Sequence, residues 1–435
     1  MKIAVIGTGY VGLVSGTCFS EFGHEVTCVD KDAKKIDALE RGIMPIYEPG
    51  LDSMVARNVD AGRLKFTTSL QEAMEGARAV FIAVGTPSRR GDGHADLQYV
   101  FAAVEEAAAY INDYTVVITK STVPVGTGAE IKARLSALLS PDLFDVASNP
   151  EFLREGAAIE DFMRPDRVVV GVDSDKAQVL LRELYRPLFL NETPVVFTNR
   201  ETAEVIKYAA NAFLATKISF INEMADLCEL VGADVQQVAR GIGLDNRIGS
   251  KFLHAGPGFG GSCFPKDTRA LVSTADQHGL PLRIVRSVVE VNEERKRAMA
   301  DKIIKACGGS VQGKKLALLG LTFKPNTDDM RESPSLDIIP ALQKAGALIH
   351  AHDPKGMEEA EKLLSNVTFH DDPYGTMKDA DALVIVTEWN QFRALDLDRA
   401  KSLMKEAILV DLRNIYAKAA PEDHGFRYTG IGRGE

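Results

Sequence analysis

The first thirty residues constrain the fold more than any other stretch of the chain. A short apolar run is followed by glycines in the spacing GxGxxG, a helical pattern and a second apolar run that ends in an acid. The residues that define this pattern are Gly7, Gly9, Gly12 and Asp30. A strand, a glycine turn, a helix and a second strand ending in a carboxylate are typical of a dinucleotide-binding βαβ unit.

Each residue of this pattern has an expected role. Gly7 would make the tight turn, Gly9 would let a pyrophosphate approach, and Gly12 would let helix and strand pack closely. The helix N-terminus would supply N–H donors and a partial positive charge. Asp30 would accept hydrogen bonds from the ribose hydroxyls, which predicts NAD rather than NADP, although nearby Lys35 leaves a 2′-phosphate open. A glycine-rich turn in another kind of α/β protein is the alternative.

The alternation of apolar strands and helices continues along the chain. Further strand-like runs cover residues 79–84, 115–119, 145–148 and 168–172. Ligands of open parallel sheets bind beyond the carboxyl ends of the strands, where polar clusters occur here. The polar residues expected in this cleft are Thr86, Ser121, Thr122, Glu151 and Glu155. Helix capping is the alternative role for Ser121 and Thr122.

Two long helical segments and a second strand–glycine–strand layout complete the fold prediction. The helical segments cover residues 200–231 and 282–307. The second layout runs from residue 314 to Asp353, and strand-like runs over residues 382–387 and 408–411 follow it. We therefore predict an α/β fold with two Rossmann-like, doubly wound parallel-sheet domains joined by a helical middle domain with a long central helix. The predicted domains are residues 1–198 for NAD binding, 199–308 for the helical middle and 309–435 for the C-terminal Rossmann-like part.

The second layout lacks the GxGxxG spacing, which argues against a second dinucleotide. Instead, Lys324, Arg331 and Arg413 lie near predicted strand ends, where cations could hold a diphosphate. Ordinary surface cations are the alternative for each of them.

Residues 256–267 combine four glycines with Cys263, Lys266 and Asp267. A thiol near a cation can be held as the nucleophilic thiolate, and the carboxylate could orient it or move protons. A mobile loop with a buried, inert cysteine is the alternative. On the long helix, Lys207 and Asn211 lie one turn apart among alanines, so a ligand could come close to both. Two solvated polar residues are the alternative there.

Composition and charge exclude several classes of protein. Lys plus Arg is 51 and Asp plus Glu is 61, and the net charge of −10 argues against nucleic acid or an anionic membrane as the main partner. The five cysteines include no CxxC pair, so neither a disulfide framework nor a thiolate zinc site is expected. His350 and His352 lack the further ligands of a metal site. Without a signal peptide or membrane span in the sequence, we expect a cytoplasmic protein.

The order of these motifs resembles the UDP-glucose/GDP-mannose dehydrogenase family over essentially the whole chain. The motifs that carry the resemblance are the GxGxxG turn, Gly85-Thr86-Pro87, residues 120–124 (KSTVP), residues 149–153 (NPEFL), Lys207 with Asn211, residues 258–267 (GFGGSCFPKD), Phe323-Lys324 and Arg331-Glu332-Ser333. The resemblance implies a four-electron oxidation of a nucleotide sugar at C6 with two NAD⁺ per turnover. Cys263 would form a thiohemiacetal and then a thioester, which water cleaves.

The resemblance also implies roles for individual residues. The catalytic positions are Cys263, Lys207, Asn211, Asp267, Glu151 and Thr122. The cofactor positions are Gly7, Gly9, Tyr10, Val11, Gly12, Asp30, Lys35, Thr86, Ser121, Thr122, Glu155, Lys266 and Arg331. The substrate positions are Glu151, Phe152, Leu153, Arg154, Lys207, Asn211, Arg247, Phe252, Phe259, Gly260, Phe323, Lys324 and Arg413.

Arg247 matches an arginine that reaches into a neighbouring subunit's site, which implies a homodimer built on the long helix. The expected reaction converts UDP-glucose to UDP-glucuronate. GDP-mannose and a UDP-N-acetylhexosamine are alternative substrates for the same chemistry. A redox-inert NAD-sensing protein, or one with a regulatory thiol, is the alternative from another class.

Overall fold

The computed structural model describes residues 1–87 and 95–434. The chain divides into two compact units. Unit 1 comprises residues 1–210 with 273–280, and unit 2 comprises residues 211–272 with those from 281 onward. The division falls within α9 (Arg200–Val231) and α11 (Phe264–Gln277), so both helices contribute residues to each unit. The three-domain division stays a prediction.

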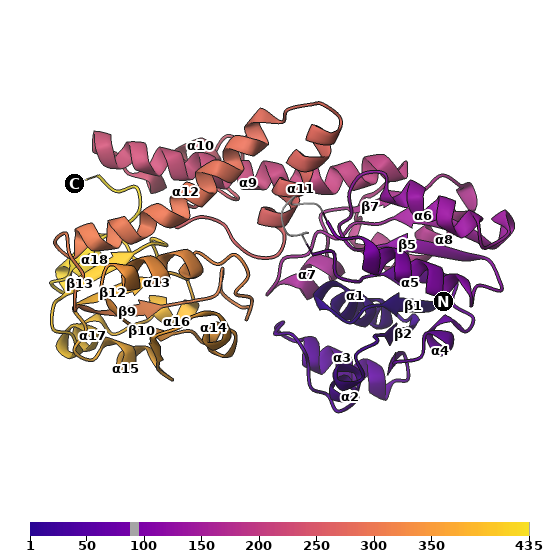
Figure 1. Ribbon diagram of the computed structural model, residues 1–435, viewed down its shortest axis with the longest axis horizontal. Coiled ribbons are helices and arrows are strands. Elements are labelled where there is room, and N and C mark those ends of the chain that lie inside the picture. The colour runs from indigo at the N-terminus through magenta and orange to yellow at the C-terminus, as the bar shows by residue number, and fades with distance from the viewer. Residues whose placement is uncertain (88–94, 435) are drawn as a thin grey trace. The chain divides into compact units, whose positions relative to one another are not determined.

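The described strands of unit 1 form one eight-stranded sheet in the order β3-β2-β1-β4-β5-β6-β7-β8 (Figure 1). The strands are β1 (Lys2–Ile6), β2 (Glu25–Val29), β3 (Leu64–Thr67), β4 (Ala79–Ile82), β5 (Thr115–Thr119), β6 (Phe144–Ser148), β7 (Val168–Gly171) and β8 (Val195–Thr198). All neighbours are parallel except β6 and β7. The chain therefore enters β7 from the edge at which β6 ends. The predicted parallel α/β sheet is confirmed, with this one reversal.

Both faces of the unit 1 sheet are covered by helices, which is why its central strands are almost continuously apolar. Ile3 and Val5 of β1 point into one core cluster, and Ala4 and Ile6 point into another. The helices are α1 (Tyr10–Glu21), α2 (Ala33–Glu40), α3 (Leu51–Asp60), α7 (Ala158–Met163) and α8 (Asp175–Leu184) on the first cluster, and α4 (Leu70–Met74), α5 (Gln98–Ala108) and α6 (Thr127–Ser136) on the second. Two 3₁₀ turns, Pro141–Leu143 and Arg186–Asn191, complete the unit.

Unit 2 contains a smaller sheet whose described strands are all parallel, in the order β11-β10-β9-β12-β13-β14. The strands are β9 (Lys315–Leu319), β10 (Leu348–His352), β11 (Val367–Phe369), β12 (Ala382–Ile385), β13 (Ile408–Asp411) and β14 (Arg427–Thr429). The helices around it are α13 (Ser335–Lys344), α14 (Met357–Leu363), α15 (Pro373–Met377), α16 (Asn390–Arg393), α17 (Leu397–Leu403) and α18 (Ala419–Asp423). Leu316 and Leu318 of β9 enter one core cluster, and Ala317 and Leu319 enter the other, as in β1. The second Rossmann-like sheet is thus confirmed.

The predicted long helix is α9, which has 32 residues. Asn199 caps this helix, because its Oδ1 accepts a hydrogen bond from the Thr202 amide at 2.8 Å. Within unit 2, the later part of α9 lies beside α12 (Arg283–Ala306), and α10 (Val235–Gly243) follows α9 (Figure 1). Lys302 of α12 pairs with Glu229 of α9 at 2.6 Å, which fastens these two helices together. Every helix in the described residues is too short or too polar to span a bilayer.

Candidate active site

The glycine turn after β1 leaves open the space that a pyrophosphate needs. Gly7 has φ +103°, and a Cβ there would lie 2.6 Å from the carbonyl oxygen of Ala83. A Cβ at Gly12 would lie 2.0 Å from the carbonyl oxygen of Gly7, whereas a Cβ at Gly9 would meet no described atom within 4 Å. Packing therefore requires the first and third glycines. The second borders open space at the N-terminus of α1, as a dinucleotide phosphate requires.

Asp30 lies at the end of β2 as an anionic acceptor. Its Oδ2 accepts hydrogen bonds from the Thr8 amide at 2.9 Å, the Thr8 hydroxyl at 2.8 Å and Lys35 Nζ at 3.2 Å. Burial raises the pKa of Asp30, but hydrogen bonds from Thr8 and Asp32 and the charge of Lys35 together hold this pKa below its ordinary value. The side chain keeps 17 % exposure, and its Oδ1 accepts the Asp32 amide at 3.1 Å. Asp30 can therefore still accept a ribose hydroxyl.

Three of the predicted hydroxyl-bearing residues meet where β4 and β5 end. The Thr86 hydroxyl donates to the carbonyl of Thr122 at 3.1 Å, and the Ser121 hydroxyl donates to the carbonyl of Val84 at 2.7 Å. All three side chains are buried. Neither Ser121 nor Thr122 caps a helix, because α6 begins only at Thr127. The capping alternative is therefore wrong.

A carboxylate that the sequence analysis missed caps α6 instead. Glu204 of α9 accepts hydrogen bonds from the amides of Gly126 at 2.7 Å and Gly128 at 2.8 Å. Burial raises the pKa of Glu204 to about 7, although both amides act to lower it. This contact ties α9, which also carries Lys207, to the loop that begins with Ser121 and Thr122.

Glu151 and Lys207 form an ion pair in the interior of unit 1. Lys207 Nζ lies 3.3 Å from Glu151 Oε1, and the two side chains are only 4 % and 5 % exposed. The other oxygen of Glu151 accepts the Leu153 amide at 2.5 Å, and the Phe152 ring centre lies 5.2 Å from Lys207 Nζ. Desolvation largely cancels the attraction of a buried ion pair, so this pair favours a chemical role over a stabilising one. The alternative that Lys207 is a solvated surface residue is wrong.

Cys263 lies directly before α11 in unit 2. The Asp267 amide donates to the Cys263 carbonyl at 2.8 Å, which closes the first helical turn. Cys263 Sγ is partly exposed and lies 3.5 Å from the Ser262 hydroxyl, whereas the other four cysteines are buried; all five lie in the described chain and none is in a disulfide. The positive end of a helix favours a thiolate, so this cysteine has the surroundings of a nucleophile.

Asn211 and Asp267 come together in unit 2. Asn211 Nδ2 donates to Asp267 Oδ2 at 2.6 Å, and Lys266 Nζ lies 3.4 Å from Asp267 Oδ1. Both Asn211 and Asp267 are buried, which contradicts the alternative that Asn211 is a solvated residue. An amide–carboxylate pair of this kind can position a water or shuttle its proton.

The glycine-rich loop before Cys263 is held at several points. The Gly256 amide donates to Asn222 Oδ1 at 2.9 Å, and Arg295 Nε donates to the Gly256 carbonyl at 3.0 Å. Asn292 bonds both backbone groups of Phe259, at 2.8 and 3.0 Å. These contacts contradict the alternative of a mobile loop. The three side chains that fix it escaped the sequence analysis, because helical residues far away in sequence carry no local signal.

The glycines of this loop are needed where other backbone passes close by. A Cβ at Gly260 would lie 2.3 Å from the Glu332 carbonyl oxygen, and one at Gly261 would lie 2.7 Å from the Phe323 ring. The Gly261 amide donates to the Arg331 carbonyl at 2.8 Å. Within unit 2, the loop before Cys263 thus packs on the loop after β9. The rings of Phe252 and Phe259 both contact Phe264, at centroid distances of 6.0 and 5.9 Å.

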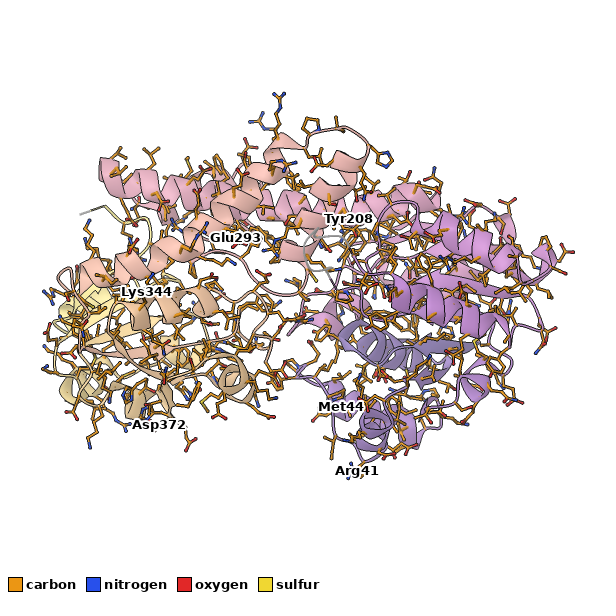
Figure 2. All side chains as sticks on the ribbon, in the orientation of Figure 1. Arg41, Met44, Tyr208, Glu293, Lys344 and Asp372 are labelled. Carbon is orange, nitrogen blue, oxygen red and sulfur yellow. The ribbon has the colours of Figure 1, made fainter. Side chains whose placement is uncertain are left out.

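Glu332 also takes part in an ion network that braces this packing. Its carboxylate pairs with Arg269 of α11 at 2.9 Å and with Lys296 of α12 at 3.4 Å. Glu293, which is labelled in Figure 2, lies on α12. It pairs with Arg269 at 2.8 Å. The hydrogen bond from Arg269 lowers the pKa of Glu332 below its ordinary value, with further help from the charge of Lys296.

The remaining predicted cations are bound by groups of their own unit. The ion pairs are Arg154–Asp161 at 2.6 Å, Arg247–Asp245 at 2.6 Å and Arg331–Asp329 at 2.7 Å. Arg413 donates to the Phe323 carbonyl at 2.9 Å, and Lys324 Nζ lies 5.2 Å from the Phe323 ring centre. These contacts bring three predicted substrate residues together beyond β9 and β13. Across residues 1–87 and 95–434, no group of three metal-ligating side chains occurs.

Comparison with known proteins decides the family. The sequence matches the UDP-glucose/GDP-mannose dehydrogenase family in its NAD binding domain over residues 1–189, its central domain over 201–294 and its UDP binding domain over 317–418. A curated UDP-glucose 6-dehydrogenase of Rhizobium meliloti (strain 1021) is 63% identical over 435 residues, which is 100% of both chains. The chain belongs to the UDP-glucose/GDP-mannose dehydrogenase family. It is an NAD-dependent dehydrogenase.

Two solved structures of related dehydrogenases agree with this fold. A UDP-glucose dehydrogenase from Pyrobaculum islandicum is 39% identical, with a TM-score of 0.91 and coverage of 100% of this chain and 98% of that chain. A UDP-D-ManNAc dehydrogenase from Pyrococcus horikoshii is 28% identical, with a TM-score of 0.86 and coverage of 100% and 99%. The fold therefore serves more than one nucleotide sugar.

In this family member, Glu48 links the NAD turn to a loop that carries predicted site residues. Its carboxylate accepts the Gly156 amide at 2.6 Å and the Ala158 amide at 2.8 Å, and it also hydrogen-bonds the Tyr10 hydroxyl. Burial and Glu48 raise the pKa of Tyr10, so the phenol stays protonated. The Tyr10 side chain is thus engaged by Glu48, and its backbone at the start of α1 remains the part suited to the cofactor. The predicted Glu155 lies directly before Gly156.

Proposed function

We propose that this protein oxidises UDP-glucose to UDP-glucuronate and that the residues described above divide the work. The substrate assignment is supported by the 63% identity to a UDP-glucose 6-dehydrogenase over the full chain. Atoms balance when one primary alcohol, one water and two NAD⁺ give one carboxylate, two NADH and three protons. Bound NAD⁺ accepts the hydride in each oxidation.

In the first oxidation, Glu151 takes up the proton of the C6 hydroxyl, and Thr122 takes part in this transfer. Lys207 stabilises the negative charge that develops on the C6 oxygen of the substrate. The buried ion pair between Glu151 and Lys207 supports these roles, because a charge acts most strongly where water is excluded. The Glu151 carboxylate is fixed by the Leu153 amide, which keeps one oxygen directed to Lys207.

In the second oxidation, Cys263 adds to the aldehyde and gives a thiohemiacetal. An aldehyde carries no hydride that can be lost to form an acid until a nucleophile has added to it. Loss of the second hydride leaves a thioester on Cys263. Asp267 then activates the water that cleaves the thioester, with Asn211 positioning it. The partly exposed Cys263 directly before α11 is the single observation on which this route most depends.

The diphosphate of the substrate is assigned to unit 2. Lys324 and Arg413 lie beyond the carboxyl ends of β9 and β13, where open sheets bind ligands. Arginine's planar fork suits a diphosphate. Phe323, which contacts both, would form the wall of this subsite.

We also propose a homodimer built on α9. Phe213, Phe220 and Leu227 recur at seven-residue intervals and are 67%, 47% and 49% exposed. Such a stripe of exposed apolar side chains along one helix is typical of a helix–helix interface. The Arg247 side chain is 90% exposed, which suits a residue that contacts a second subunit. A nucleophilic thiol needs a reducing compartment, so we place the reaction in the cytoplasm.

The decisive measurement is the amount of NADH formed per UDP-glucose consumed. Two NADH per sugar are expected, whereas one NADH with release of free aldehyde would contradict the cysteine route. A panel of UDP- and GDP-sugars tests the alternative substrates, GDP-mannose and the UDP-N-acetylhexosamines. The latter are kept as candidates because a UDP-D-ManNAc dehydrogenase has a similar structure. A protein that only senses NAD would form no NADH with any sugar.

Cys263→Ser separates the thiol from the rest of the site. The variant should bind NAD with unchanged affinity but should lose net acid formation by at least about a hundredfold, because the hydroxyl is a far weaker nucleophile. Cys307→Ser, which changes a buried cysteine, is the matched control and should keep normal turnover. If Cys263→Ser turns over as fast as the wild type, the nucleophile is misassigned.

A further inference from the structure

A second buried lysine lies in the interior of unit 1, next to the Glu151–Lys207 pair. Lys120 directly follows β5 and is buried. Its Nζ donates to Asn149 Oδ1 at 3.1 Å and to the Tyr185 hydroxyl at 3.5 Å, and lies 5.7 Å from the Phe162 ring centre. The proposed reaction assigns no role to this lysine. A buried ammonium is costly, so its retention needs a reason.

Lys120 is connected to Glu151 through one side chain. Both polar atoms of the Asn149 side chain form hydrogen bonds. Its Oδ1 also accepts from the Tyr185 hydroxyl at 2.5 Å, and its Nδ2 donates to the Val169 carbonyl at 2.7 Å. The backbone of Asn149 donates to the Thr119 carbonyl at 2.9 Å. Asn149 is therefore held from β5, β7 and the Lys120 side chain. Only Pro150 separates it from Glu151, so the position of Asn149 sets the start of the segment that carries Glu151.

Lys120 also interacts electrostatically with the Glu151–Lys207 pair. Burial lowers the pKa of Lys120 to about 8, with the carboxylate of Glu151 acting to raise it and the ammonium of Lys207 acting to lower it further. The remaining titratable group against it is Tyr185, whose pKa is raised by burial and which stays neutral. Lys120, Lys207 and Glu151 therefore act on one another electrostatically.

The count of charges matters for the reaction. Glu151 and Lys207 alone would neutralise each other, and a neutral pair gives little stabilisation to an oxygen that becomes negative. Lys120 is a second cation that interacts electrostatically with Glu151.

We propose that Lys120 is a positioning residue that holds Glu151 in place through Asn149 and, as a second cation acting on that carboxylate, reduces how far Glu151 offsets the charge that Lys207 presents to the substrate oxygen. The inference rests on the proposed function of Glu151 and Lys207. Because Lys120 loses its proton as the pH rises, the first oxidation should weaken on the alkaline side, above about pH 8.

The test compares Lys120→Met with Tyr185→Phe. Lys120→Met removes the charge but keeps an unbranched side chain, whereas Tyr185→Phe removes one hydrogen bond to Asn149 and keeps the charge. The readouts are the pH profile of kcat for UDP-glucose and the rate of the first NADH formed per site in a single turnover. For Lys120→Met we expect a loss of about 10²-fold near pH 7.5, the size seen when one stabilising group is removed, with NAD affinity and sugar KM within about threefold.

The pH profiles separate a charge effect from loss of packing. Lys120→Met should lose the alkaline limb of the wild-type profile, and Tyr185→Phe should retain it. A Lys120→Met enzyme whose kcat and pH profile match the wild type overturns the proposal. So does a rate loss with an unchanged alkaline limb, since that result assigns Lys120 to packing alone.

A readout without turnover keeps this test separate from that of the proposed function. The folded pKa of about 8 lies below the ordinary 10.5, so between these values the unfolded chain binds more protons and stability rises with pH. The Tm of the wild type should therefore rise relative to that of Lys120→Met from pH 8 to 10.5. A constant difference overturns the proposal even if UDP-glucose is not the substrate. Absence of NADH from UDP-glucose with a rising difference overturns the substrate assignment alone.

Discussion

Both sheets of this molecule have a glycine turn after one strand and an aspartate after the next strand, but the two aspartates make different contacts. In unit 1, Gly7 follows β1 and Asp30 ends β2; in unit 2, Gly320 follows β9 and Asp353 follows β10. Both glycines have positive φ, +103° and +89°, and at both a Cβ would collide with the neighbouring strand's continuation. The turn is thus equivalent in the two units.

The two acids differ in how much of their hydrogen-bonding capacity the protein uses. The Asp353 side chain is fully buried and accepts from the Leu321 amide at 2.7 Å, the Thr322 amide at 3.1 Å and Trp389 Nε1 at 3.1 Å. Its other oxygen accepts the amides of Lys355 at 2.9 Å and Gly356 at 2.7 Å. Asp30 keeps 17 % exposure and one oxygen with a single backbone partner. An acid at the end of the second strand can therefore either bind a ribose or fasten its own loops, and burial decides which.

The largest expected effect comes from changing both acids to their amides. Asp353→Asn replaces one acceptor oxygen by an NH₂ donor that faces buried N–H donors, and should lower the free energy of unfolding of unit 2 by about 2–4 kcal/mol. Asp30→Asn should lower stability by less than about 1 kcal/mol but weaken NAD binding at least about tenfold, because a charged acceptor is lost. Trp389 is the sole tryptophan, so its fluorescence in a denaturant titration reports on unit 2. Equal losses of stability in the two variants would contradict the conclusion that Asp353 fastens loops and Asp30 does not.

The next largest effect concerns the glycines. Gly320→Ala places a Cβ 2.4 Å from the Thr387 side chain at a φ of +89°, and should cost about 1–3 kcal/mol of stability. Gly9→Ala meets no described atom within 4 Å, so its stability should be nearly unchanged while NAD affinity falls. Thermal melts with and without NAD measure both quantities. If the Gly9→Ala protein binds NAD with normal affinity, close approach of the pyrophosphate does not explain this glycine.

The smallest expected effect sharpens the comparison within unit 1, where Glu204 fastens a turn as Asp353 does in unit 2. The pKa of Glu204 is raised to about 7, so between its ordinary value of 4.5 and 7 the folded state binds more protons than the unfolded state. Stability should therefore fall as the pH rises through this window, relative to Glu204→Gln. The difference in free energy of unfolding between the two proteins should change by no more than about 1.4 kcal/mol per unit of pH. Tm values of both proteins from pH 4.5 to 7 test it, and parallel curves would contradict the raised pKa.

The strands that the sequence predicted are the ones buried inside the sheets. All ten inner strands were predicted within a few residues, because a strand covered on both faces is a continuous apolar run. The four strands that escaped prediction are β3, β8, β11 and β14, which are the four sheet edges. Each of these four edge strands contains an exposed residue and has at most four residues, whereas the inner strands are mostly buried.

Some residues of the candidate site could likewise be predicted from the sequence, and others could not. The glycine turn, Asp30 and the cysteine loop are local patterns, and each is readable within a dozen residues. The burial of Glu48, Lys120 and Glu204 was missed, because the sequence around a charged residue does not reveal that it is buried. The convergence of the predicted Cys263 and Lys207 on one substrate stays a prediction.

The sequence by itself determined the family, the two Rossmann-like sheets, the cofactor and the residue types of the chemistry, because these depend on short patterns of glycine, strand and helix. Only the tertiary structure decided which charged groups are buried and against what. That Lys207 meets Glu151, that Asn211 meets Asp267 and that Asp353 is enclosed by donors all follow from contacts between distant segments. Burial and pairing set the strength of a charge, and neither is a property of a residue's neighbours in sequence.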